Sequence, residues 1–134
     1  MEIKERDELQ KAWLKSSKED FKIAGDLIGM KHYQWALFLC HIAIEKVLKA
    51  NYIKIKEQYP PPIHKLVKLA TDCKIKLSEE QIDDLREMTS FNIEARYDII
   101  KDKLYKKATK EFTKKYFEKT KKLLNYFISL IWQT

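Results

Sequence analysis

"CHIAIEKVLKA", residues 40–50, is the stretch that decides how this chain folds. Its apolar residues predict a buried helix, yet His41, Glu45 and Lys49 follow one another at intervals of four residues. Four residues is about one helical turn, so the three polar side chains form one stripe along the helix. Two interpretations are open. The stripe lines the exposed edge of the helix, or it faces a groove and meets polar groups from another element.

The rest of the chain is also typical of a helical protein. It has 134 residues, of which 45% are hydrophobic and 35% charged, and this length and composition fit one globular domain over residues 1–134. Only two glycines and three prolines are present, and the prolines are adjacent at positions 60–62. Long stretches therefore lack helix breakers, which predicts the all-α class.

The hydrophobic periodicity predicts five helices. They are expected at residues 5–28, 31–56, 63–73, 78–95 and 107–132. Gly29 is a suitable stop for the first helix, and Ser78 with Gln81 fits a capping box at the start of the fourth. Residues 95–107 are expected to form a connection of mixed character. The second helix is apolar nearly all round, so it is either central or faces another subunit.

The charge of the chain is strongly basic and concentrated in one segment. The net charge is +7, and residues 101–122 hold ten lysines against three acidic residues. This segment indicates an anionic partner such as nucleic acid, a nucleotide or an acidic protein, or else a solvated lysine face.

Several classes of site are not expected. The two cysteines and three histidines show no metal-binding spacing, and glycine-rich phosphate loops are excluded by composition, so we expect no metal and no cofactor. No apolar run approaches the roughly 20 residues needed to cross a bilayer, and the first ten residues are too charged for a signal peptide. We therefore expect a cytoplasmic protein without membrane contact.

A second candidate for chemistry is "NIEARYD", residues 92–98. Arg96 can bind a carboxylate or a phosphate with two parallel hydrogen bonds, and Tyr97 beside it adds a flat face and a hydroxyl. The pair could hold a nucleotide, or Arg96 could pair with Glu45 and lock two helices together. His64, two residues after the last proline, is expected to cap or pack locally.

Three stretches resemble the HEPN domain family (higher eukaryotes and prokaryotes nucleotide-binding). "KEDFKIAGDLIGMKHYQWALFLCHIAIEKVLKA", residues 18–50, is similar to the first helical hairpin of the family, including a Gly–x–Lys–x–Tyr-like turn. "PPIHKLVKLA", residues 61–70, resembles the entry to its third helix, and "FNIEARYD", residues 91–98, resembles its Arg–Tyr signature. The resemblance covers nearly all of the chain in the right order.

The resemblance implies an up-and-down bundle of four to five helices, like that of nucleotidyltransferase substrate-binding subunits, and usually a homodimer. Many members are encoded beside a minimal nucleotidyltransferase and form a toxin–antitoxin pair with it. Others are thought to bind nucleotides, and many are ribonucleases whose signature is an arginine followed four to six residues later by a histidine.

This sequence departs from the ribonuclease signature, because no histidine follows His64 anywhere in the chain. Histidine would move the protons in that reaction, so we expect no ribonuclease activity and no catalytic residue. The hypothesis is instead a ligand-binding site in which Glu45 orients Arg96 and Arg96 binds an anion. The remaining members of this expected site are His41, Lys49 and Tyr97. The alternatives are an RNA-binding protein or weak ribonuclease using Arg96 and the Lys101–Lys122 surface, and a plain scaffold.

Overall fold

The computed structural model describes the backbone at residues 1–96 and 98–132 and the side chains at residues 1–96 and 102–132. This part of the chain forms six α-helices and no strand, which confirms the all-α class. The helices are α1 (Ile3–Gly29), α2 (Tyr33–Lys56), α3 (Leu66–Asp72), α4 (Glu79–Arg96), α5 (Asp98–Lys107) and α6 (Lys110–Ile131). Among these helices, none is both long enough and apolar enough to span a lipid bilayer.

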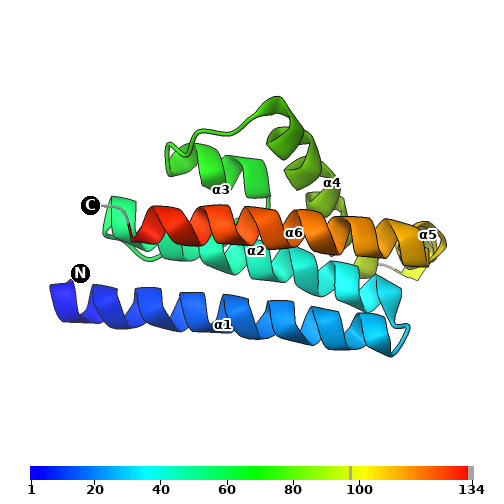
Figure 1. Ribbon diagram of the computed structural model, residues 1–134. Coiled ribbons are helices and arrows are strands. Elements are labelled where there is room, and N and C mark those ends of the chain that lie inside the picture. Colours follow the sequence, from blue (N-terminus) through cyan, green and yellow to red (C-terminus); the bar gives the residue numbers. More distant parts are fainter. Residues whose placement is uncertain (97, 133–134) are drawn as a thin grey trace.

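The four longer helices alternate in direction, as an up-and-down bundle requires (Figure 1). α1 runs opposite to α2 and α6, and α4 packs on the other side of α2 with the short α3 beside it. α5 makes the corner between α4 and α6. The predicted bundle is therefore confirmed, with α3 and α5 as short helices within its connections.

α2 lies at the centre of the bundle, where it contacts α1, α3, α4 and α6. Thirteen of its 24 residues are buried, including most of its leucine, isoleucine and valine side chains. Asn51 ties this helix to α6, because its Nδ2 donates to the backbone oxygen of Phe127 at 3.1 Å. The all-round apolar pattern thus places α2 centrally, as one of the two sequence interpretations predicted.

The predicted helix boundaries are confirmed at some ends and wrong at others. The capping box exists: Ser78 Oγ accepts from the Gln81 backbone N–H at 3.1 Å, and Gln81 Oε1 accepts from the Ser78 N–H at 2.8 Å. The expected connection over residues 95–107 is instead largely helical, as α5. The last helix starts later than predicted because Thr109 Oγ1 caps it by accepting from the Phe112 N–H at 3.2 Å.

The turn between α1 and α2 places a lysine where glycine is usual. The His32 N–H bonds the Leu27 oxygen at 2.8 Å and the Lys31 N–H bonds the Ile28 oxygen at 3.0 Å, the pair of bonds that closes a Schellman motif. The left-handed residue of this motif is Lys31, with φ of 63°. Gly29 is the last residue of α1, as expected for a stop, but it does not take the left-handed conformation.

Candidate functional site

The polar stripe of α2 is buried inside the bundle. The exposed fractions are 0% for His41, 6% for Glu45 and 7% for Lys49. The interpretation that these residues line an exposed helix edge is therefore wrong, and the alternative of a stripe that meets polar groups from another element is confirmed. A buried carboxylate in such a place needs cations or hydrogen-bond donors around it.

Two side chains donate hydrogen bonds to the Glu45 carboxylate. Lys49, one turn further along α2, donates to its Oε2 at 3.1 Å. His64, from the segment between the prolines and α3, places Nδ1 2.8 Å from the other oxygen, Oε1. The Lys49 ammonium also lies 5.4 Å from the ring centre of Trp13 on α1, within cation–π range. We call the four residues His41, Glu45, Lys49 and His64 the Glu45 cluster.

The hydrogen bonds of the Glu45 cluster assign the protons on both histidines. His41 Nε2 lies 3.0 Å from the backbone oxygen of His64, and a carbonyl can only accept, so His41 Nε2 carries a hydrogen. By the same reasoning His64 Nδ1 donates to the Glu45 carboxylate. The Nε2 atom of His64 is then left for other partners, and its side chain is 46% exposed. The cluster thus includes one partly exposed imidazole with a nitrogen that Glu45 does not bind.

Burial and neighbouring charges shift two pKa values in the Glu45 cluster. Burial alone would raise the pKa of Glu45, but the hydrogen bonds from His64 and Lys49 outweigh it and lower that pKa below its ordinary value. Burial lowers the pKa of His41, and the charge of Arg96 lowers it further, whereas the hydrogen bond to the His64 backbone oxygen and the Glu45 carboxylate oppose this without outweighing it. Glu45 is therefore ionised and His41 neutral near neutral pH.

Stability should fall as the solution becomes acidic. The folded pKa of His41 lies below its ordinary value of 6.5, so the unfolded chain takes up the proton first. The contribution of His41 is complete above that value and is lost as the pH falls towards the folded pKa. We expect the urea midpoint of the wild type to drop between about pH 7.5 and pH 5. The drop should be smaller for His41→Gln, and parallel profiles for the two proteins would contradict this assignment.

Arg96 lies near the Glu45 cluster but does not pair with Glu45. It is exposed at the end of α4, and its Nε donates to Asn92 Oδ1 at 3.1 Å. The expected Glu45–Arg96 pair is therefore wrong, because His64 and Lys49 already occupy both carboxylate oxygens. Arg96 is nonetheless close enough to act electrostatically on His41. Tyr97, the other expected ligand-binding residue of this segment, lies outside the described residues.

His64 is the member of the site that sequence reasoning missed. Local capping was expected for it, whereas its ring and its backbone oxygen both bind α2. The available signal was a histidine two residues after a proline run, because such a rigid segment can carry a side chain back onto the preceding helix.

Part of the basic segment is neutralised by carboxylates. Lys107 Nζ lies 2.8 Å from Glu87 Oε1 and 3.3 Å from Glu94 Oε1. Lys119 pairs with Asp84 at 3.0 Å and with Glu80 at 3.6 Å. Burial alone would lower the pKa of Lys107, but the bonds to the two glutamates raise it. The basic surface is thus weaker than the lysine count indicates.

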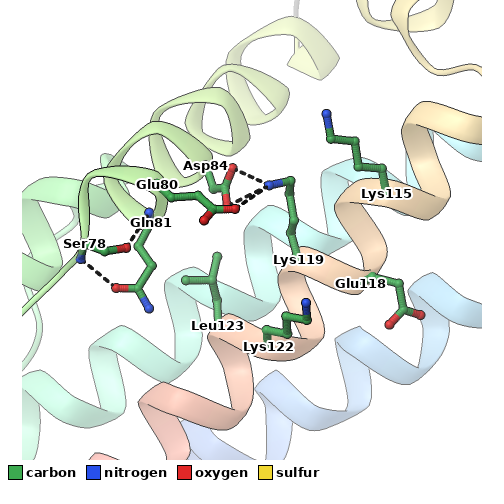
Figure 2. Close-up of a pocket in the computed structure, with 9 residues that line it drawn as sticks. All are labelled: Ser78, Glu80, Gln81, Asp84, Lys115, Glu118, Lys119, Lys122 and Leu123. Carbon is green, nitrogen blue, oxygen red and sulfur yellow. Dashed lines mark hydrogen bonds and ion pairs between the residues drawn. The ribbon is translucent and has the colours of Figure 1, made fainter.

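The pair at Lys119 belongs to a cavity of about 480 Å³ between α4 and α6 (Figure 2). Three lysines and three carboxylates line it, and Figure 2 shows Lys119 directed at Asp84 and Glu80. Because the opposite charges are equal in number, this cavity has no excess charge to attract an ion.

The described residues offer neither a metal site nor a reactive thiol. In the part of the chain that the structure describes, no group of three or more His, Cys, Asp or Glu side chains could hold a metal ion. Cys40 and Cys73 are free and buried, and burial raises the pKa of each thiol to about 12. Such thiols are unreactive near neutral pH.

The fold and the site define an up-and-down helical bundle with a buried charged cluster beside an exposed arginine. The profile of the HEPN domain family matches residues 10–130, and this chain belongs to that family. The fold is similar to the crystal structure of TT1696 from Thermus thermophilus, with a TM-score of 0.76 and 18% sequence identity over 90% of this chain and 96% of the other. No curated protein matches the sequence significantly.

Proposed function

We propose that this chain is a non-catalytic HEPN protein that binds the phosphate of a nucleotide at Arg96. The observation that carries the proposal is the way Arg96 is held. Asn92, which is only 4% exposed, fixes the Nε of the guanidinium at 3.1 Å. The two terminal nitrogens have no hydrogen-bond partner among the described residues. A guanidinium held in this way presents a fork that matches two phosphate oxygens.

The Glu45 cluster supports phosphate binding through its charge. Lys49 and Arg96 are two cations against the one carboxylate of Glu45, and His64 adds a further positive charge whenever it is protonated. The excess of positive charge attracts an anion, and partial burial reduces its screening by salt. The Nε2 of His64, which Glu45 does not bind, can donate to the same ligand when protonated.

We further propose that residues 1–134 act as one helical domain, as a homodimer, in a toxin–antitoxin pair with a minimal nucleotidyltransferase. Membership of the HEPN family supports this part, since many members have such a partner. Ile93, on the last turn of α4 before Arg96, is 48% exposed and offers an apolar contact for a second subunit. Light scattering after gel filtration tests the dimer, and co-purification with the protein encoded beside this one tests the partner.

Nucleotide binding should depend on Arg96. We expect ATP or AMP to bind the wild type in isothermal titration, and Arg96→Gln to weaken the affinity of the site at Arg96 at least tenfold, because a charge-assisted contact contributes about 1.5–3 kcal/mol. Arg86→Gln is the matched control, since it removes another exposed arginine of α4. Failure of both nucleotides to bind the wild type at millimolar concentration, or equal weakening by both variants, would refute the proposal.

One observation favours a second function, which is RNA binding with weak ribonuclease activity. Glu45 orients His64 through Nδ1 and leaves its Nε2 available as in a general base, and both His64 and Arg96 act electrostatically on His41. Cleavage of a fluorogenic RNA that disappears in His64→Gln would establish this activity. Absence of cleavage by the wild type would leave the non-catalytic function.

A further inference from the structure

A second concave surface lies where α1 turns into α2, at the end of the bundle that also holds α5 (Figure 1). It is a cavity of about 410 Å³ and shares no residue with the Glu45 cluster or with Arg96. Sites for small molecules commonly have volumes of about 300–1,000 Å³. The size of the cavity therefore suits a ligand of a few tens of atoms.

Among the residues that the structure describes, the cavity is lined by basic side chains and by no acidic one. Lys31 and His32 come from the turn and Lys106 from the end of α5, and none of the eight lining residues is Asp or Glu. The first turn of α2 also opens here, and His32 at its N-cap makes no side-chain hydrogen bond to it. The positive end of this 24-residue helix, which has no side-chain cap, adds to the attraction for an anion. The cavity between α4 and α6, whose charges balance, lacks this property.

Flat aromatic side chains form another part of the cavity wall. Tyr105 is 69% exposed and Trp35 is 37% exposed, and both line the cavity beside the lysines. The exposed ring of Tyr105 can stack on a nucleobase, which typically contributes about 1–3 kcal/mol per base. Basic and aromatic groups in one small cavity favour a ligand that carries an anion and a planar ring together.

Gln34 supplies a hydrogen-bonding group that the protein itself leaves unused. It lines the cavity, and its Oε1 is buried without a hydrogen-bond partner among the described residues. A buried acceptor in this state costs free energy unless a ligand donates to it. The exocyclic amino group of adenine, cytosine or guanine is a donor of the required kind.

The backbone conformation of Lys31 also bears on how this residue contributes to the cavity. Its φ of 63° lies in the left-handed region, which glycine adopts without the steric cost that a Cβ brings. Glycine would close the turn equally well but would bring no ammonium group to the cavity. Glu57 and Lys74 also have a positive φ, so the conformation alone does not mark a site, and Lys31 matters here because its side chain lines the cavity.

We propose that this cavity binds a nucleotide that carries a phosphate monoester. The phosphate lies against Lys31, Lys106 and the N-terminus of α2, the base stacks on Tyr105, and Gln34 accepts from its amino group. The ligand is a free nucleoside monophosphate or the 5′-phosphorylated end of single-stranded nucleic acid. This site goes beyond the function proposed above, because it is separate from Arg96 and is occupied whether or not Arg96 binds.

The test uses AMP and the full chain carrying Arg96→Gln, so that the site at α4 does not contribute. We expect saturable binding with one site per chain in isothermal titration. Lys31→Gln combined with Lys106→Gln should weaken it at least tenfold, and Tyr105→Ala should weaken it about tenfold. The matched control combines Lys18→Gln with Lys114→Gln, which removes two exposed lysines that do not line the cavity. Thermal unfolding of each variant shows whether it is folded.

Four probes then identify the source of the phosphate. Inorganic phosphate should bind more weakly than AMP, because it cannot stack. A short oligonucleotide with a 5′-phosphate that binds more tightly than both AMP and the same strand with a 5′-hydroxyl identifies the nucleic-acid end, and tighter AMP binding identifies the free nucleotide. Absence of binding by AMP and by both oligonucleotides would overturn the proposal, as would equal weakening by the control pair. Loss of binding in Arg96→Gln, together with retention when the cavity substitutions are made in the wild-type chain, would overturn this site and leave the proposed function intact.

Discussion

Replacing Glu45 by alanine should destabilise the protein by about 3–5 kcal/mol, because it leaves a lysine ammonium buried without its carboxylate. Lys49 is 7% exposed and its nearest acceptor is the Glu45 oxygen at 3.1 Å. The same change removes the acceptor of His64. The free energy of unfolding, measured by urea titration near neutral pH, reports the loss.

Two further variants separate the buried pair from simple loss of packing. Glu45→Gln keeps the volume and one acceptor, so it should cost less than alanine and remain measurable if alanine does not fold. Glu45→Leu combined with Lys49→Met should recover most of the stability, since replacing both partners of a buried pair by apolar residues is often neutral. Glu118→Ala, an exposed acid on α6, is the control and should change stability by less than about 0.5 kcal/mol. A loss below about 1 kcal/mol for Glu45→Ala would mean that the carboxylate is not desolvated.

The helices could be predicted largely from local signals, because apolar spacing and capping residues act over a few positions. The capping box at Ser78 and the uninterrupted α1 are of this kind. α5 was missed since it is only ten residues long and six of them are charged, so its pattern resembles a connection. Short helices of this type depend on packing against the rest of the bundle, which a sequence window does not contain.

The candidate site could be predicted only in part, for a related reason. The spacing of His41, Glu45 and Lys49 fixes that they share one face of a helix, and burial of that face follows from the apolar residues around it. Which group reaches the carboxylate depends on the path of the chain after the prolines. That path brings His64 to Glu45 and leaves Arg96 bonded to Asn92.

The number of lysines in the sequence also predicts the basic surface only in part. The sequence shows ten lysines between residues 101 and 122, but it does not show which of them meet carboxylates elsewhere. Lys107 and Lys119 pair with acidic residues of α4, so they hold helices together as well as charging the surface. A local excess of one charge is therefore weak evidence for a binding surface until the partners are known.

Replacing Lys107 by methionine should destabilise the protein by about 2–3 kcal/mol, because Glu94 then loses the cation that faces it. The Glu94 residue is 6% exposed, and its Oε2 is already buried without a hydrogen-bond partner among the described residues. Lys107 lies at the end of α5 and binds α4 through Glu87 and Glu94. Loss of the Lys107 ammonium should therefore weaken the packing of α5 against α4, next to Arg96. We expect it to lower both the stability of the protein and the affinity of Arg96 for a nucleotide.

The control for this change is Lys103→Met, since Lys103 is exposed on the same short helix. We expect that variant to unfold within about 0.5 kcal/mol of the wild type. Glu94→Gln added to Lys107→Met should restore part of the loss, because an uncharged amide is less costly to bury than an unpaired carboxylate. Equal urea midpoints for Lys107→Met and Lys103→Met would show that Glu94 is solvated without its lysine, and that the α4–α5 corner depends on apolar packing alone.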